Sequence, residues 1–169
     1  KSGYVIKGSR VDLVRSQIGA AVRKGTPKPD ISTVEALTKT LLDAKSIAYS
    51  ASASGVYLST ELFPKLGVAE QLKDKAKKIM SERVGAVVAR GDAELGFQQV
   101  SELLSIPGVD FIGELPPEAQ KTVLFSAGIT KNVNNLNASR DLIAFLASPK
   151  AAPTIQKAGL KPVLPALPW

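Results

Sequence analysis

The chain has 169 residues, of which 44% are hydrophobic and 5% aromatic, and its formal net charge is +7. This size predicts one ordinary domain, or one domain and part of a second, with a core built mainly from Ala, Val, Leu and Ile. The chain contains no Cys, which excludes disulfides, thiol catalysis and zinc–thiolate sites, and no His, which removes the usual general base near neutral pH.

The first elements predicted along the chain are two strands, a loop and a helix. Apolar residues predict short strands at 11–14 and 17–22. Two prolines beside a glycine predict a loop over 25–29. The sequence Ser-Thr-Val-Glu then forms a capping box, with Ser32 at the cap, and it predicts a helix that ends near Asp43.

Four serines follow within nine residues, at 46–54. A short apolar strand, Ile47–Tyr49, leads into them, and we expect a helix from Gly55 to about Phe63. The first N–H groups of a helix have no partner inside it and carry the positive end of its dipole, so such a junction suits an anion. Two interpretations stay open: Ser52 or Ser54 only caps the helix, or these serines contact a ligand.

The rest of the chain continues to alternate between strands and helices. Strands are predicted at 79–80, 93–98, 109–112 and 121–129. Helices or helical turns are predicted at 68–77, 84–90, 101–104, 116–117, 136–147 and 151–158. The tail, 161–169, holds three of the eleven prolines, so we expect it to be extended and loosely held.

This alternation predicts an α/β fold with a mostly parallel sheet and flanking helices. Ligands of such sheets bind beyond the carboxyl ends of the strands, where the following helices begin. Two junctions qualify, 50–56 and 81–84, and the strand that ends at Gln98-Gln99 brings two amides to the same edge. Hydroxyl, backbone N–H and amide donors are all neutral. The sequence therefore predicts a site that holds an anion by hydrogen bonds rather than by ion pairs, without a cofactor or a metal.

The positive charge is scattered along the chain. Its densest cluster, at 73–78 on a predicted helix, has no interleaved aromatic residues, so we expect a solvated surface and no nucleic-acid partner. The surplus of positive charge suits a protein that attracts anions. No apolar run approaches the ~18 residues that a membrane span needs. No signal peptide is visible, which indicates a cytosolic protein or one given without its leader.

Five segments resemble the molybdate-type, periplasmic type II substrate-binding proteins of bacterial ABC transporters. They are 47–62, 84–97, 106–110, 115–118 and 142–149. The resemblance covers the chain from about Gly8 to Leu160. It implies two α/β lobes joined by two crossing strands, with the ligand in the cleft between the lobes.

The resemblance also implies a division of the chain. Residues 1–22 would form the outgoing hinge region, 23–121 the second lobe, and 122–160 the return hinge strand and the helices of an incomplete first lobe, followed by the Pro-rich tail 161–169. The opening half of the first lobe, which normally supplies ligand contacts, would be absent. The chain would then be processed or truncated, or the rest would be a separate piece.

Ligand contacts are carried over from the family by position. The family's helix-start contact falls at Ser54, and a later one falls near Ser81. Gln99 stands where the family has a tyrosine, and Ser50-Ala51 stands where Asp-Pro is usual. These departures leave molybdate, tungstate, another oxyanion or a small carboxylate open. The predicted ligand-binding residues are Ser52, Ser54, Gly55, Val56, Ser81 and Gln99.

The resemblance implies a periplasmic solute-binding component of an importer, with a small anionic ligand, a membrane permease as its partner and no catalysis. An alternative is the effector-sensing domain of a transcription regulator, which would need a helix-turn-helix that this chain lacks. An enzyme is a third hypothesis. A Ser nucleophile without His would need a Lys partner, but Lys45 and Ser46 are adjacent on a strand and point to opposite faces.

The incomplete first lobe leads to one further expectation. A helix that normally packs on the missing part would expose its apolar face, here Leu142, Ile143 and Leu146. Because exposed apolar patches favour self-association, a homodimer is predicted.

Overall fold

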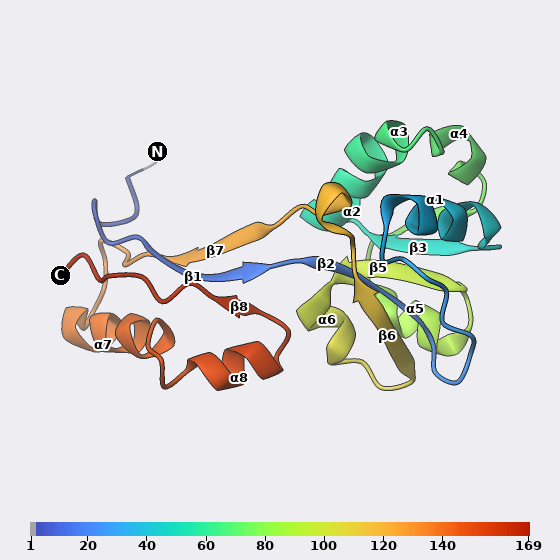
Figure 1. Cartoon of the computed structure of the whole chain (residues 1–169). Coiled ribbons are helices and arrows are strands. Elements are labelled where there is room, and N and C mark those ends of the chain that lie inside the picture. Colours follow the sequence, from blue (N-terminus) through green and yellow to red (C-terminus); the bar gives the residue numbers. More distant parts are fainter. Residues whose placement is uncertain (1–2) are drawn as a thin grey trace. The chain divides into compact units, whose positions relative to one another are not determined.

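The computed structural model describes residues 3–169, so the first two residues of the expected hinge region 1–22 lie outside the described part. The chain divides into two compact units. Unit 1 comprises Lys1–Ser16 with Val123–Trp169, and unit 2 comprises Gln17–Thr122 (Figure 1). The division into hinge regions and lobes that the sequence suggested stays a prediction.

Unit 2 is built on a five-stranded sheet. Its strands are β2 (Ile18–Arg23), β3 (Ile47–Ser50), β4 (Ala76–Ile79), β5 (Leu95–Gln99) and β6 (Val109–Glu114). They lie in the order β4-β3-β5-β2-β6. β3 pairs in parallel with β4 and β5, whereas β2 runs antiparallel to β5 and β6. The α/β fold class is confirmed, with a sheet in which parallel and antiparallel pairs are mixed.

Helices cover both faces of this sheet. They are α1 (Val34–Asp43), α2 (Ala53–Tyr57), the π-helix η1 (Leu58–Leu62), α3 (Phe63–Lys65), α4 (Ala69–Leu72), α5 (Val84–Arg90), α6 (Val100–Leu104) and the 3-10 turn η2 (Pro117–Ala119). Helices α1 to α4 lie on one side of the sheet, and α5 and α6 lie on the other (Figure 1).

Two apolar clusters reflect these two layers. Ile47 packs in the larger cluster with Leu37 and Leu58, whereas its neighbour Ala48 packs in the smaller one with Val84. Successive side chains of a strand point to opposite faces, so one short apolar strand supplies both layers. β3 is therefore buried on both sides, as its apolar run Ile47–Tyr49 indicates.

Three local expectations in unit 2 are corrected. The N-cap of α1 is Thr33 and not Ser32, because Thr33 is extended and its hydroxyl accepts a hydrogen bond from the N–H of Ala36 at 3.1 Å. The helix expected over 68–77 ends at Leu72. The residues after it form β4 because they pair with β3, so Lys77 and Lys78 lie exposed on an edge strand, a common place for Lys.

The helix expected over 55–63 is longer than predicted. It is continuous from Ala53 to Lys65, with a π-helical turn in its middle. Helix α5 ends at Gly91 as expected, and the positive φ of that glycine (86°) explains why the helix stops there.

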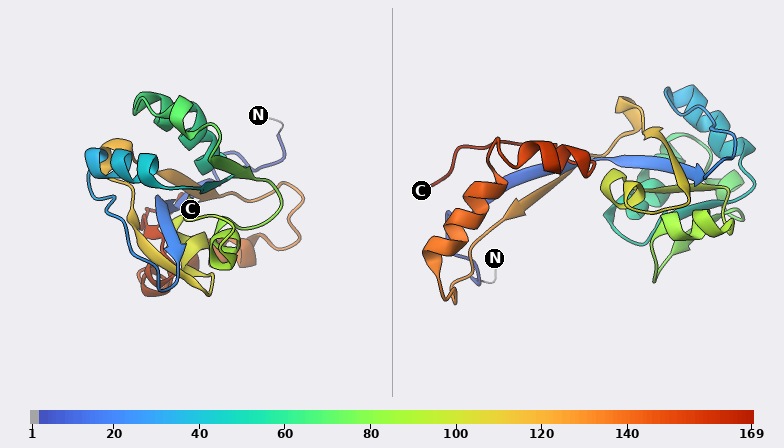
Figure 2. Two further views of the ribbon diagram at one scale, coloured as in Figure 1. Left: turned by 90° about the vertical axis from the view of Figure 1, so that its right-hand side faces the viewer. Right: turned by 90° about the horizontal axis from the view of Figure 1, so that it is seen from below.

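Unit 1 contains a three-stranded antiparallel sheet and two helices. The elements are β1 (Val11–Ser16), β7 (Val123–Ala127), α7 (Leu136–Leu146), α8 (Ala152–Lys157) and β8 (Lys161–Pro162). β1 lies between β7 and β8, and Figure 2 shows α7 and α8 beside these strands. Its core gathers Val11, Ile129, Ile143 and Ala147. The expectation that Ile143 lies on an exposed face is therefore wrong, whereas Leu142 is exposed and Leu146 is partly exposed.

The Pro-rich tail is extended but not loosely held. Its first residues form β8 beside β1, and the N–H of Val163 donates to the carbonyl of Leu13 at 2.9 Å. Leu167 packs against the core of unit 1, and the guanidinium of Arg140 lies 5.7 Å from the centre of the Trp169 ring. Apolar and cation–π contacts thus hold a segment that has few backbone donors.

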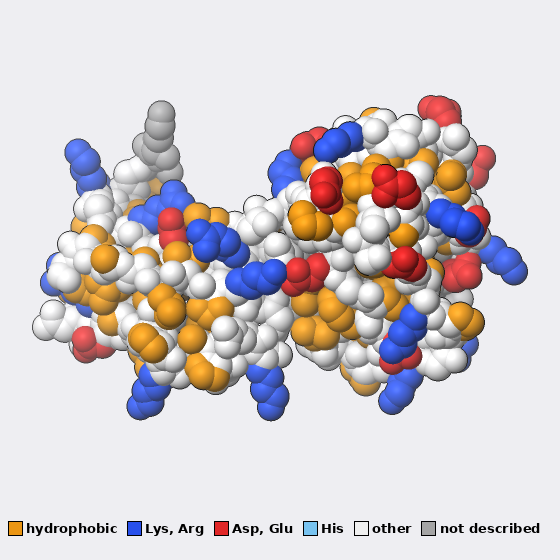
Figure 3. All heavy atoms as spheres, viewed as in Figure 1, with side chains coloured by type: hydrophobic (Ala, Val, Ile, Leu, Met, Phe, Trp, Pro, Cys, Tyr) orange, Lys and Arg blue, Asp and Glu red, His pale blue; other side chains and the backbone are white. Residues whose placement is uncertain are grey.

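Across residues 3–169, none of the helices has the length and apolar character that a membrane crossing requires. Lys and Arg side chains are spread over the visible faces of both units (Figure 3).

Candidate functional site

The serine run forms a cluster of hydroxyl groups where β3 ends and α2 begins. The Ser50 Oγ lies 2.7 Å from the Ser52 Oγ and 2.9 Å from the Ser54 Oγ, and the last two are 3.4 Å apart. Ser50 and Ser54 are buried, whereas Ser52 is exposed. Each hydroxyl both donates and accepts, so the three form a closed ring with one side open to solvent. We call Ser50, Ser52 and Ser54 the serine cluster.

The capping interpretation fails for the side chain of Ser52. Ser52 occupies the N-cap position of α2 with an extended backbone, but its side chain makes no cap hydrogen bond. Its carbonyl accepts the N–H of Val56 at 3.0 Å, while its hydroxyl turns to the other two serines. The hydroxyl is therefore available for a role other than closing the helix.

Gly55 explains why the serines meet. A Cβ on this residue would lie 1.6 Å from the carbonyl oxygen of Ser50 and 3.0 Å from the side chain of Tyr49. Only glycine allows the first turn of α2 to approach the end of β3 so closely. The structure therefore assigns Gly55 a steric role, which brings Ser54 back onto Ser50.

The other predicted residues lie near the same edge of the sheet as the serine cluster. Tyr49 pairs with Phe97 in the parallel ladder, so the ends of β3 and β5 lie side by side. Gln99 is buried at the end of β5, and Ser81 is exposed in the turn before α5. Val56 is 46% exposed on α2. The N–H of Val56 donates to the carbonyl of Ser52 at 3.0 Å, within the first turn of the helix.

Two residues of this edge have roles that the sequence interpretation did not assign. Ser50 is the central member of the serine cluster, although only its place in the 50–56 junction pointed to it. The Gln98 Oε1 accepts the N–H of Val84 at 3.0 Å, so this amide caps α5, whose N-cap residue Arg83 makes no side-chain cap bond. A buried amide at the end of a strand can therefore cap a neighbouring helix as well as contact a ligand.

The cluster is electrically neutral. Its hydroxyl hydrogen bonds run between serines, with no ion pair among them. Across the described residues 3–169, no group of three or more acidic side chains is placed to hold a metal ion. Hydroxyl donors at the positive end of a helix stabilise an anion without an opposing side-chain charge.

Tyr57 lies about one turn of α2 beyond Ser54, and its phenol makes contacts that hold this helix in place. The Tyr57 hydroxyl donates to the carbonyl of Ala119 at 3.0 Å, and burial, with the nearby Glu61 carboxylate, raises the pKa of Tyr57. The Lys121 Nζ lies 4.9 Å from the centre of the Tyr57 ring and 2.6 Å from Glu61. These contacts tie the helix to the last residues of unit 2.

Residues 1–161 match the family model described as bacterial extracellular solute-binding protein. A curated relative from a Pseudomonas species, named aconitate isomerase, is 53% identical over 162 residues, which make up 96% of this chain and 62% of the relative. The chain thus spans less than two thirds of that relative's length.

Solved structures share the fold at lower identity. A substrate-binding domain from Clostridium difficile, ascribed to a molybdenum ABC transporter, is 20% identical with a TM-score of 0.75, over 95% of this chain and 69% of that one. The periplasmic molybdate-binding protein of Azotobacter vinelandii is 22% identical with a TM-score of 0.68, over 97% of this chain and 71% of that one. At such identities the likeness concerns the fold.

Proposed function

This chain belongs to the bacterial extracellular solute-binding protein family, and we propose that it binds a small carboxylate anion at the serine cluster. The sequence resemblance to molybdate-type substrate-binding proteins is confirmed by the family match and by the solved structures. The identity of the anion, the permease partner and the periplasmic location are part of the proposal.

The observation that supports this function is the convergence of three hydroxyls on one helix start. Ser50 and Ser54 are buried and Ser52 is exposed, so an anion that reaches Ser52 from solvent can replace the mutual bonds of the cluster. Each serine then donates its one proton to an acceptor oxygen. A hydrogen bond to an ionised acceptor is roughly twice as strong as a neutral one, so the exchange favours binding.

A carboxylate is favoured over molybdate by the relatives. The molybdate-binding structures are 20–22% identical and support the fold alone, whereas the relative at 53% is named for aconitate, which carries three carboxylates. Gln99 also departs from the tyrosine of the molybdate-type pattern. Neutral donors can bind the oxygens of molybdate as well as those of a carboxylate, so the donors do not choose between them. We therefore base the proposed ligand class on the relative with the higher identity.

Transport is the biological setting that we propose. In an importer, the ligand stabilises the form of the binding protein that the permease recognises. Self-association through the exposed residues of α7, such as Leu142, stays a prediction alongside it.

Calorimetric titration of the full encoded protein tests the ligand class. The panel is trans-aconitate, cis-aconitate, citrate, molybdate, tungstate and sulfate. We expect saturable binding of at least one carboxylate, weakened by Ser54→Ala. Binding of molybdate or tungstate with no response to any carboxylate would contradict the carboxylate assignment, and no response to any anion would contradict the binding function.

A second candidate, the isomerisation of aconitate, is favoured by the 53% identical relative named for that activity. Within this chain, which contains neither His nor Cys, the side chains that could transfer a proton are carboxylates, Lys and Tyr. Incubation of the full encoded protein with trans-aconitate, followed by proton NMR of the vinyl signal, separates binding from turnover. Appearance of cis-aconitate at a rate proportional to protein concentration would establish the enzyme, and its absence despite saturable binding would leave a binding protein.

A further inference from the structure

We propose that unit 2 holds a second ligand site, a pocket for a small organic anion with an apolar body, at the opposite end of β3 from the serine cluster. The pocket has a volume of about 620 Å³, within the ~300–1,000 Å³ that small-molecule sites usually occupy. The proposal does not depend on the function proposed for the serine cluster.

The two sites share no residue. Lys45 and Ser46 precede β3 and line the pocket, whereas Ser50 ends β3 and belongs to the serine cluster. The four residues of β3, at about 3.3 Å each, separate them by roughly 13 Å along the strand. A ligand in the pocket is therefore distinct from one at the serine cluster.

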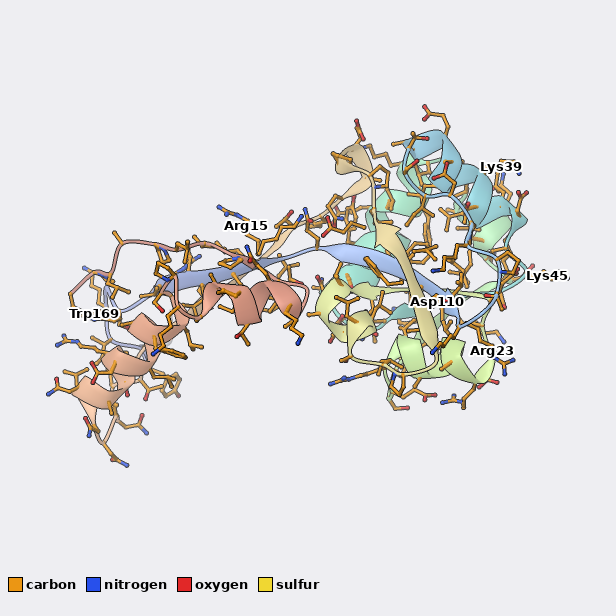
Figure 4. The ribbon with its side chains drawn as sticks, turned by 60° about the horizontal axis from the view of Figure 1, so that its bottom comes forward. Arg15, Arg23, Lys39, Lys45, Asp110 and Trp169 are labelled. Carbon is orange, nitrogen blue, oxygen red and sulfur yellow. The ribbon has the colours of Figure 1, made fainter. Side chains whose placement is uncertain are left out.

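Three cationic side chains from separate segments line the pocket. Arg23 ends β2, Lys28 lies in the loop after it, and Lys45 lies in the turn between α1 and β3. Arg23, Lys45 and Asp110 appear at this end of unit 2 in Figure 4. Lys28 lies 4.0 Å from Asp110, whereas Arg23 and Lys45 make no ion pair with any residue in 3–169. Arg23 and Lys45 are thus the two cations of the lining that could bind an anion.

The lining contains two acidic side chains, Asp43 and Glu94. Asp43 forms an ion pair with Lys39, which lies outside the lining. The Glu94 Oε2 accepts the backbone N–H of Lys45 at 2.7 Å. With Lys28 paired to Asp110 and Asp43 paired to Lys39, the charges left in the lining are those of Arg23 and Lys45 against that of Glu94. This balance favours an anion.

Most of the buried residues that line the pocket are apolar. Hydrogen bonds hold the loop at its exposed edge in place. Val22 and Leu95 are buried at its base, and two prolines of the loop add apolar surface. The Gly25 N–H donates to the Asp110 Oδ2 at 3.0 Å, and the Thr26 hydroxyl donates to the carbonyl of Arg23 at 2.7 Å. An apolar wall with cations at the rim fits a carboxylate or phosphate group attached to a hydrocarbon body. Because Arg23 and Lys45 are exposed, binding should weaken as salt is added.

Amide NMR of the full chain tests the site with benzoate and phenyl phosphate as probes. Benzyl alcohol supplies the apolar body without charge, and inorganic phosphate supplies the charge without the body. We expect saturable shifts of the Gly25, Lys45 and Gly91 amides with one or both organic anions, and weaker binding of the two partial probes. The Arg23→Gln/Lys45→Gln variant should lower the affinity at least about tenfold, the loss of one charge-assisted hydrogen bond or more.

A charge-matched control distinguishes an effect of the pocket's own charges on probe binding from an effect of the protein's overall positive charge. Lys73→Gln/Lys77→Gln removes the same two charges from exposed positions outside the lining and should leave probe affinity unchanged. The site is disproved if the pocket amides show no saturable shift, if benzyl alcohol binds as tightly as benzoate, or if both double variants weaken binding equally. The spectrum itself reports whether each variant is folded.

Discussion

The carbonyl oxygen of Ser50 occupies the space that a side chain on Gly55 would need, since a Cβ there would lie 1.6 Å away. This contact between a strand end and the first turn of the next helix positions the hydroxyls of the serine cluster. The absence of one methyl group at Gly55 therefore decides whether the candidate site forms.

Gly55→Ala should destabilise unit 2. The new methyl group must push α2 away from Ser50, and such overpacking costs about 1–3 kcal/mol. Urea unfolding followed by circular dichroism measures the loss. Ala53→Ser, an exposed change two residues earlier in the helix, should alter stability by less than ~0.5 kcal/mol. Equal stability of the Gly55→Ala variant and the parent would refute the steric role.

Ser54→Ala should weaken carboxylate binding by roughly tenfold to a hundredfold, the value of one hydrogen bond to a charged acceptor. Ser59→Ala is the matched control, because its hydroxyl bonds to the carbonyl of Gly55 within the same helix at 2.9 Å. Calorimetry in the same buffer compares the two. If Ser59→Ala weakens binding as much as Ser54→Ala, the effect comes from the helix and not from the serine cluster.

Asp12 should titrate below its ordinary range. The Ser126 hydroxyl, donating at 2.6 Å, and then the Arg10 guanidinium lower the pKa of Asp12. Because the folded pKa lies below the unfolded one, the ionised Asp12 stabilises unit 1 above the unfolded pKa, and this contribution is lost as the pH falls through the folded pKa, below about pH 4.

Carbon NMR of the Asp12 carboxyl group measures this directly. Ser126→Ala should raise the midpoint toward the ordinary value, because it removes the largest contribution to the shift. Ser148→Ala, whose hydroxyl bonds to the carbonyl of Phe145, should leave the midpoint unchanged. A midpoint that Ser126→Ala fails to raise would show that the hydroxyl does not stabilise the carboxylate.

Arg140→Gln should loosen the C-terminal tail. The guanidinium of Arg140 lies over the Trp169 ring, and a cation–π contact at an exposed site contributes about 0.5–1 kcal/mol. Trp169 is the only tryptophan of the chain, so its fluorescence anisotropy reports on the tail alone. We expect lower anisotropy in Arg140→Gln than in Lys150→Gln, a change at an exposed lysine of the same unit. Equal values would mean that other contacts, such as that of Leu167, are sufficient to hold the tail.

Much of the fold followed from local sequence patterns. The apolar run at 47–49, the helix ending at Gly91 and the strand pair at 11–22 were predictable because periodicity and glycine conformations act over a few residues. β4 was not predictable in this way. Its sequence Ala-Lys-Lys-Ile carries no strand period, and it is a strand because β3 offers it a partner.

The candidate site divides in the same manner. The sequence pointed to Ser52, Ser54 and Gly55, because small hydroxyl residues between an apolar strand and a helix are a local signal. It placed Ser81 and Gln99 in the same site from family position, and that placement stays a prediction. Ser50 was missed as a member, since its hydroxyl meets Ser54 only after the helix folds back over the strand end.

The sequence by itself determined the α/β class, the neutral donors at the end of β3 and the absence of His and Cys chemistry, because composition and short-range periodicity control all three. Only the tertiary structure decided which hydroxyls meet, that Gln98 caps α5, and that Arg23 and Lys45 line one pocket. These outcomes depend on distances between residues far apart in the chain or on the angle at which a helix returns to its sheet. Such distances and angles are set by packing of the whole unit and not by local pattern.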